Sequence, residues 1–201
     1  FWNQRYGKDE FAYGVEPNDF LVEFAPRLPT GGKVLCLADG EGRNGVWLAQ
    51  QGLDVLSVDS STVAQEKGRR LARSRGVEMR VELADLAAWP FPKAQFDVVV
   101  AIFIQFAGPE LRQHLFEEMK SALKPGGLLF LEGYRPEQLA YGTGGPRIAE
   151  NLYTQAMLRE AFADMEILDL AAYDAVIEEG AGHKGMSALI DLVARKPRQE
   201  P

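Results

Sequence analysis

The feature that most constrains this chain is a short apolar run that enters a glycine-rich turn and leaves it as a helix. Residues 33–38 form the apolar run, and Gly40 and Gly42 lie in the turn. Residues 43–51 then show a helical pattern that a glycine stops. A turn without Cβ atoms lets a ligand approach the backbone, and the helix offers unpaired N–H groups and the positive end of its dipole. This unit predicts a ligand-binding loop at the end of a sheet strand.

The same alternation of strand and helix patterns continues along the chain. Further strands are predicted at residues 54–58, 77–83, 96–104 and 127–133, with helical patterns between most of them. The last two strand patterns, 165–177 and 186–194, have no helix between them and are typical of a hairpin. The alternation predicts an α/β fold with a doubly wound parallel sheet, in which ligands bind outside the carboxyl ends of the strands.

An acidic residue follows the second strand at an informative distance. Asp59 comes 19 residues after Gly40, from 59 minus 40, and an acid about 20 residues after the first glycine is placed to accept hydrogen bonds from a ribose diol. The alternative is a turn that only packs strand against helix and an aspartate that caps the next helix. Because Gly40-x-Gly42-x-x-Gly45 is also the dinucleotide fingerprint, the motif by itself leaves a nicotinamide cofactor and S-adenosylmethionine open.

Composition excludes several classes of partner. The 201 residues allow a single domain, and the net charge of −7 with a pI near 5.0 makes long nucleic acids poor partners. A basic cluster on one predicted helix lacks interleaved aromatic residues and is typical of a solvated face; its members are Lys67, Arg69, Arg70, Arg73 and Arg75.

The same composition points to a cytoplasmic protein. A single cysteine, Cys36, and two histidines leave no internal disulfide and no expected metal site. No apolar run approaches the roughly 20 residues that span a bilayer, so no membrane partner is expected. The sequence begins at Phe1, so a removed leader stays open. We expect a monomer or a homodimer.

Five segments together resemble the class I S-adenosylmethionine-dependent methyltransferases over nearly the whole chain. They are VLCLADGEGRNGVWLA (34–49), LSVDSS (56–61), ELADLAAWPF (82–91), FDVVVAIFIQF (96–106) and LKPGGLLFLEGY (123–134). The aromatic N-terminal segment and the GEGRN turn look like the tellurite-resistance and thiopurine-type small-molecule branch. The resemblance implies a Rossmann-like sheet of seven strands with an antiparallel last strand, S-adenosylmethionine as cofactor and S-adenosylhomocysteine as product. Residues 1–30 would be an N-terminal aromatic lid segment and helix, and 31–201 the methyltransferase domain.

The resemblance also implies contacts to the cofactor. The implied cofactor-binding residues are Arg5 near the methionine carboxylate, Ala38, Gly40 and Gly42 at the methionine and sugar, Asp59 and Ser60 at the ribose, Asp85 and the Leu86 backbone at the adenine, and Ile102 beside the methionine chain. An alternative for Asp85 is a turn carboxylate that caps the next segment. The family usually has glycine at Ala38, where alanine costs little if φ is negative, and an acid at Cys36, which we expect to be a buried apolar residue.

The acceptor is predicted to be a small molecule, such as a thiol, a chalcogen oxyanion or another small polar compound. Residues 102–105 lack the Asn/Asp-Pro-Pro-aromatic motif of enzymes that methylate amino groups of nucleic acids or glutamine. Five N-terminal rings are expected either to close a lid over the pocket or to cover an apolar face of the sheet; they are Phe1, Trp2, Tyr6, Phe11 and Tyr13.

The long connection at 134–153 favours a substrate loop, and His183 is expected either to deprotonate an acceptor, to bind an anion or to be solvated. The candidate catalytic residues are Tyr6, Tyr13, Tyr134, Arg135 and His183. Two rival functions stay open: a nicotinamide-dependent oxidoreductase and a non-catalytic regulator that binds S-adenosylmethionine.

Overall fold

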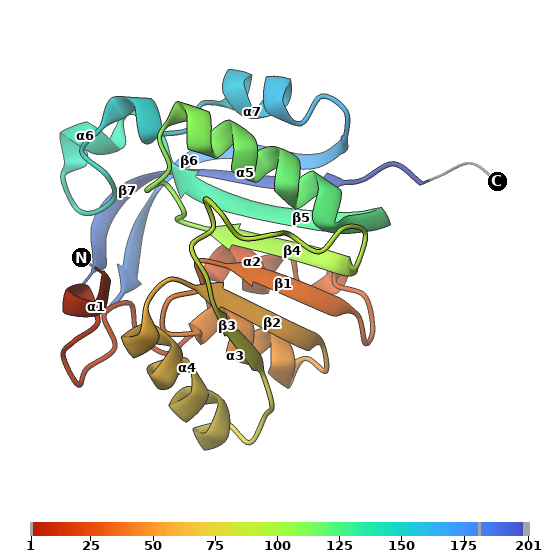
Figure 1. Ribbon diagram of the computed structural model, residues 1–201. Helices are drawn as coiled ribbons and strands as arrows, with labels where there is room; N and C mark the ends of the chain where they lie inside the picture. Colours follow the sequence, from red (N-terminus) through yellow and green to blue (C-terminus); the bar gives the residue numbers. More distant parts are fainter. Residues whose placement is uncertain (1, 181, 199–201) are drawn as a thin grey trace.

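The computed structural model describes residues 2–180 and 182–198, and within these ranges seven strands form one sheet in the order β3-β2-β1-β4-β5-β7-β6 (Figure 1). The strands are β1 Lys33–Leu37, β2 Asp54–Asp59, β3 Arg80–Leu83, β4 Phe96–Ile102, β5 Leu123–Tyr134, β6 Glu166–Glu179 and β7 His183–Arg195. The first five are parallel, and β7 is antiparallel to both β5 and β6. The predicted doubly wound α/β sheet with an antiparallel last strand is confirmed.

Helices cover both faces of the sheet. They are α1 Trp2–Arg5, α2 Asp19–Glu23, α3 Arg43–Gln50, α4 Thr62–Ser74, α5 Pro109–Ala122, α6 Gln138–Tyr141 and α7 Gln155–Ala161, with 3-10 turns at Ala25–Arg27 and Ala149–Asn151. Phe20 of α2 and Leu48 of α3 are buried with strand residues in one core cluster, and Leu115 of α5 and Leu158 of α7 are buried in a second. Helix α4 packs beside α3 and over the edge strand β3. None of the helices in the described ranges is both long and apolar enough to cross a membrane.

Several expected element boundaries are different in the structure, and two of them have a structural reason in the packing and pairing of the strands. The third strand begins at Arg80, since Val77 and Met79 pack against a small cluster between α3 and α4 instead of joining the sheet. The fifth strand begins at Leu123, which pairs with Phe96, so the Lys-Pro-Gly-Gly segment belongs to the strand.

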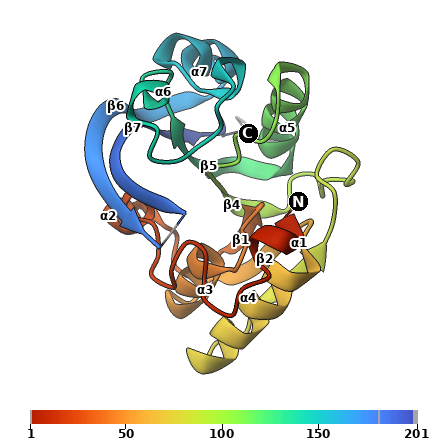
Figure 2. The same ribbon diagram turned by 90° about the vertical axis from the view of Figure 1, so that its left-hand side faces the viewer.

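The β6–β7 hairpin extends beyond the rest of the sheet. Strand β7 pairs with β5 only over Leu189–Arg195, whereas its pairing with β6 continues to Glu179 opposite His183. Figure 2 shows this extension curving past α2 towards the N-terminal segment. There the Gly182 N–H donates to the Ala12 carbonyl at 2.9 Å. The hairpin therefore brings His183 to the edge where the parallel strands end.

A pair of buried carboxyl groups lies where this hairpin joins β5. Glu132 and Asp191 are directly opposite each other in the β5–β7 register. The Tyr173 hydroxyl donates to Asp191 at 2.8 Å, and the Asn18 amide donates to Glu132 at 2.5 Å. Burial raises the pKa of Asp191 to about 7, and burial followed by repulsion from Asp191 raises the pKa of Glu132 well above its ordinary value. The pair therefore holds a proton at neutral pH.

We expect Asp191→Asn to become more stable relative to the wild-type protein as pH rises from about 5 to about 8. An acid whose pKa is raised on folding stabilises the folded state while it is protonated, and this contribution is lost as pH rises through the folded pKa. Asparagine does not titrate, so the variant escapes that loss. Urea unfolding at several pH values measures the difference in free energy of unfolding.

The control is Asp97→Asn. Asp97 is partly buried, but the hydrogen bond from Lys124 lowers its pKa. The contribution of Asp97 to the free energy of unfolding therefore changes below the range of pH 5 to 8 and not within it. A difference between Asp191→Asn and wild type that does not change with pH would contradict the shared-proton assignment.

Candidate functional site

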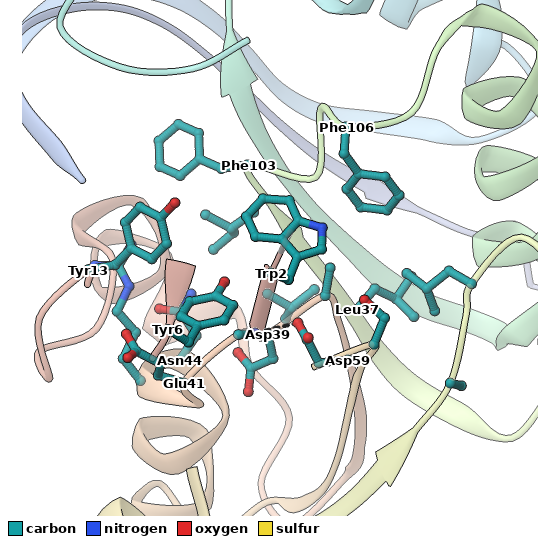
Figure 3. Close-up of a pocket in the computed structure, with 18 of the residues that line it drawn as sticks. Trp2, Tyr6, Tyr13, Leu37, Asp39, Glu41, Asn44, Asp59, Phe103 and Phe106 are labelled. Carbon is teal, nitrogen blue, oxygen red and sulfur yellow. Dashed lines mark hydrogen bonds between the residues drawn. The ribbon is translucent and has the colours of Figure 1, made fainter. Parts of the chain in front are cut away.

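A cavity opens where β1, β2 and β4 end, and it collects most of the predicted site residues (Figure 3). Its lining includes Tyr6, Tyr13, Ala38, Gly40, Asp59, Ser60, Asp85, Leu86, Ile102 and His183. These residues come from the N-terminal segment, from four loops at the strand ends and from the tip of the β6–β7 hairpin. The cavity therefore lies at the edge of the sheet where the motif spacing predicts a ligand.

Asp59, at the end of β2, connects this strand to the loop after β1 through hydrogen bonds. One carboxylate oxygen accepts the Gly40 N–H at 2.9 Å and the other accepts the Ser61 N–H at 2.8 Å. Burial raises the pKa of Asp59. A carboxylate offers about four lone pairs, so one on each oxygen remains for a ligand. Two adjacent hydroxyl groups, as in a ribose diol, match this pair of acceptors.

The two turn glycines have different surroundings. Gly40 has φ +57°, and a Cβ at this position would lie 2.8 Å from the Tyr6 hydroxyl oxygen, so a side chain would fill the lining of the cavity. Gly42 begins α3, and its Cβ would lie 3.0 Å from the Gly68 Cα in α4. Gly42 is not part of the lining; it lets two helices approach each other.

Asp85 and Leu86 follow β3 on the other side of Asp59. The Ala84 N–H donates to the Asp59 carbonyl at 3.1 Å, which holds this loop beside β2. The exposed Asp85 carboxylate accepts the Ala87 N–H at 3.0 Å, so it does form the turn contact named as the alternative. It also lines the cavity, and its second oxygen has no hydrogen bond in the described part of the chain.

Aromatic rings from the N-terminal segment lie over the cavity (Figure 3). The Trp2 and Tyr6 rings are stacked with centroids 6.0 Å apart, and Tyr13 meets Tyr6 edge-on at 6.2 Å. Phe11 instead packs against the cluster between α3 and α4. Phe1, which was expected to belong to the same group, lies outside the described residues.

Buried polar contacts hold this N-terminal segment in place. Glu41 accepts the Ala12 N–H at 2.7 Å and forms an ion pair with Lys67 at 2.7 Å, and Lys67 also donates to the Glu10 carbonyl at 2.8 Å. Lys67 was expected to be part of a solvated basic face, and this is wrong because its ammonium group is buried in this contact.

Besides Gly42, three predicted site residues lie outside the lining. Arg5 is exposed, with its guanidinium 5.7 Å from the centre of the Tyr13 ring. Tyr134 is buried behind Phe103, against which its ring stacks with centroids 4.7 Å apart. Arg135 donates to the Leu189 carbonyl and forms an ion pair with Asp174. The 134–153 connection lies along the hairpin, and α6 contacts β7.

The sequence interpretation missed several lining residues. Phe103, Phe106, Arg43 and Asn44 all line the cavity. Arg43 and Asn44 are the last two letters of the GEGRN turn, which was an available signal. Phe103 follows β4 with φ +55°, and nothing in the apolar run around it indicates that conformation.

The charges around the cavity favour a cationic ligand. Four acids line it, namely Asp39, Glu41, Asp59 and Asp85, against Arg43 and His183. Burial raises the pKa of Asp39 to about 7. The aromatic faces of Tyr6 and Tyr13 add a second element that attracts cations. A sulfonium compound with a ribose diol and an adenine fits this donor and acceptor set.

Comparison with known proteins agrees with the fold. Residues 34–127 match the family model of a methyltransferase domain. The chain is 33% identical over 127 residues to the demethylmenaquinone methyltransferase of Thermus thermophilus, covering 62% of this chain and 55% of that protein. It is 32% identical over 132 residues to ribosomal RNA small subunit methyltransferase B of the same species, covering 62% of this chain and 33% of that protein.

Solved structures show the same fold over nearly the full chain. TehB from Haemophilus influenzae superposes with a TM-score of 0.73 at 19% identity, covering 97% of this chain and 65% of that chain. A SAM-dependent methyltransferase from Methanosarcina mazei superposes with a TM-score of 0.72 at 17% identity, covering 92% of this chain and 100% of that chain.

The fold is therefore the Rossmann-like methyltransferase fold. Residues 34–127 are similar to the domain of S-adenosylmethionine-dependent methyltransferases, a class whose cofactor is S-adenosylmethionine and whose product is S-adenosylhomocysteine. The chain spans about half the length of the demethylmenaquinone methyltransferase that it matches and a third of the RNA methyltransferase.

The structure also corrects the expectation for Ala38. Its φ is +46°, in the left-handed region where a Cβ is strained, so the proviso of a negative φ fails. A non-glycine residue in this conformation costs on the order of 1–3 kcal/mol of folding free energy. Glycine avoids the strain, but it loses more conformational entropy on folding, which cancels part of the gain. Cys36 is buried as expected, and burial raises the pKa of its thiol.

We expect Ala38→Gly to stabilise the protein by roughly 1 kcal/mol, because glycine relieves the strain at positive φ. Thermal unfolding followed by circular dichroism measures the change. The matched control is Ala64→Gly in the first turn of α4, which we expect to destabilise by roughly 1 kcal/mol because glycine is a poor helix former. Destabilisation by Ala38→Gly would contradict the strain assigned to this position.

Proposed function

We propose that this protein binds S-adenosylmethionine in the cavity at the strand ends and transfers its methyl group to a small-molecule acceptor. The observation that carries the proposal is the meeting of Asp59, Asp85 and the bare Gly40 backbone around one cavity. The methyltransferase relatives and the shared fold support the same function.

Each part of the cofactor has a matching group in the cavity. The free lone pairs of Asp59 would accept both ribose hydroxyls, and Ser60 lies beside them. Asp85 would accept the adenine amino group while the Leu86 backbone meets the ring. Ile102 would lie against the methionine chain. When bound, S-adenosylmethionine supplies an electrophilic methyl group with a good leaving group.

The protein's own contribution would be to position the acceptor and to exclude water. Effective molarities for well-oriented groups show that holding reactants in line supplies much of the rate acceleration. Residues 2–30 would act as a lid, since Trp2, Tyr6 and Tyr13 already lie over the cavity. The Ala12 contacts to Glu41 and Gly182 would hold that lid closed.

Several observations favour a small acceptor over a nucleic acid. The cavity is bounded by the lid on one side and by the hairpin tip on the other, and its lining is acidic. Three of the basic residues on and just after α4 pair with acids of the same chain: Arg69 and Arg73 face Glu66, and Arg75 pairs with Glu16. One matched relative is named for a small-molecule acceptor, demethylmenaquinone, although another is named for ribosomal RNA.

We expect Asp59→Asn to weaken S-adenosylhomocysteine binding by about tenfold to a hundredfold, because hydrogen bonds to a charged group contribute about 1.5–3 kcal/mol. Isothermal titration calorimetry measures the dissociation constant. Circular dichroism must show that the variant is folded, since Asp59 also holds Gly40 and Ser61.

The matched control is Asp97→Asn. Asp97 is also an aspartate that accepts a backbone N–H, from Lys33 at 2.8 Å, but it does not line the cavity. Its substitution should leave binding unchanged. Unchanged binding by a folded Asp59→Asn variant would refute the ribose contact. Tighter binding of NADH than of S-adenosylhomocysteine would favour the oxidoreductase, and binding without methyl-donor consumption across acceptors would favour the regulator.

A further inference from the structure

The tip of the β6–β7 hairpin carries an ordered charged network that the cofactor contacts do not use. Glu179 lies at its centre, where one carboxylate oxygen accepts the Arg43 guanidinium at 2.8 Å and the other accepts the Asn18 amide at 2.9 Å. The Arg43 and Glu179 side chains are 9% and 11% exposed. Nδ1 of His183 lies 3.4 Å from Glu179 Oε2, within hydrogen-bond range.

The imidazole ring of His183 is held from several sides. Its centroid lies 4.4 Å from that of Tyr13, 4.5 Å from that of Phe103 and 5.7 Å from that of Tyr134. The residue lines the cavity although it is only 8% exposed. Nε2 makes no hydrogen bond in the described ranges, and it is not among their fully buried atoms without a partner. It is therefore the nitrogen left for a molecule in the cavity.

The surrounding charges set the protonation of this histidine. Burial opposes ionisation of Glu179, but hydrogen bonds from His183 and Arg43 lower its pKa to about 2, so it is ionised. Burial lowers the pKa of His183 below its ordinary value, Glu179 on β6 opposes this, and Arg43 on α3 and Arg5 on α1 add to the lowering. The hydroxyls of Tyr13 and Tyr134 complete the titratable groups facing the ring. At neutral pH the ring is therefore neutral, with its Nδ1–H directed to the carboxylate.

We propose that His183 is a general base that accepts the proton of a neutral hydroxyl acceptor of the phenol or enol type, with Glu179 as its positioning residue. This inference rests on the proposed methyl transfer and names the acceptor class for the same cavity. Arg43 and Asn18 would act through Glu179 by fixing its carboxylate. The arrangement is the pairing of an imidazole with an orienting acid that general-base catalysis requires.

The acceptor class follows from which candidate acceptors must lose a proton to become nucleophilic. A thiol with a pKa of about 8.5 ionises appreciably without help, whereas a phenol with a pKa of about 10 does not. A chalcogen oxyanion is already ionised, so a base would have no proton to accept from it. A neutral hydroxyl compound does need one, and a flat hydroxyl compound would pack against Phe103 and Phe106, which line the cavity.

The proposed step transfers one methyl group and one proton. The acceptor oxygen forms a bond to the donated methyl carbon, the carbon–sulfur bond breaks with its electron pair remaining on sulfur, and the hydroxyl proton passes to Nε2 of His183. The imidazolium formed then returns its proton to water. The products are a methyl ether and S-adenosylhomocysteine.

The first test reads the tautomer and needs neither cofactor nor acceptor. The experiment is long-range ¹H–¹⁵N NMR of the His114→Gln variant. The chain has two histidines, so this substitution leaves His183 as the single one, and His114 is exposed on α5. We expect a protonated Nδ1 and an unprotonated Nε2 at about pH 7. Glu179→Gln should lower the pKa of His183, since it removes the adjacent negative charge. A protonated Nε2, or a charged ring, at that pH would overturn the proposal.

The second test compares phenol and thiophenol as matched probes. We expect His183→Ala to lower kcat/KM for phenol by about 100-fold or more, as general-base catalysis contributes about 10²–10⁴. Thiophenol, which ionises readily, should lose far less. The rate with phenol should also fall as pH drops through the pKa of His183. Equal losses with both probes, or wild-type turnover of thiophenol alone, would overturn the proposed base and acceptor class.

The two proposals fail in different ways. If wild-type protein does not bind S-adenosylhomocysteine, the proposed methyl transfer fails whatever the tautomer. If wild-type protein binds S-adenosylhomocysteine but the His114→Gln spectrum shows a protonated Nε2, the proposed cofactor site is supported and the proposed role of His183 as a base is refuted. His114→Gln should leave binding and turnover unchanged.

Discussion

The hydrogen bonds of one carboxylate organise this molecule. Asp59 accepts the Gly40 N–H from the loop after β1 and the Ser61 N–H at the start of α4, so the ends of two parallel strands and the first turn of a helix are joined through a single side chain. The same loop is also held to β2 by Asp39, whose N–H donates to the Val58 carbonyl at 3.4 Å and whose carboxylate accepts the Ser57 hydroxyl at 2.9 Å. Asp59 also lines the cavity, so the residue that joins these elements lies where we propose that the cofactor binds.

Strain accompanies that organisation at the edge of the cavity. Ala38 and Phe103 both have positive φ, and they follow β1 and β4, the two central strands that border the site. Residues in this conformation persist only where the surrounding contacts determine them. Phe103 is held by ring contacts to Tyr134 and His183. At both positions the chain leaves its strand and contributes to the lining of the cavity.

Long-range polar contacts then close the site from two sides. The N-terminal segment is attached through Glu41 and Lys67, and the hairpin tip is attached through Arg43 and Asn18 to Glu179. Both sets of contacts converge on the loop after β1 and the start of α3. A buried charge that loses its partner is costly, so these pairs hold the lid and the hairpin in register with the cofactor loop.

The sequence by itself determined the order of strands and helices along the chain, the hairpin at the end, and the glycine loop after the first strand with Asp59 beside it, because these follow from local apolar periodicity and from spacing along one βαβ unit. It did not determine where Tyr134, Arg135 and Arg5 lie, nor that His183 reaches the cavity with Glu179 beside it. Those placements depend on the curvature of the β6–β7 hairpin and on contacts between residues distant in sequence, such as Arg135 with Leu189 and Arg43 with Glu179. Periodicity carries no information about such contacts, since the partners meet only after the sheet has formed.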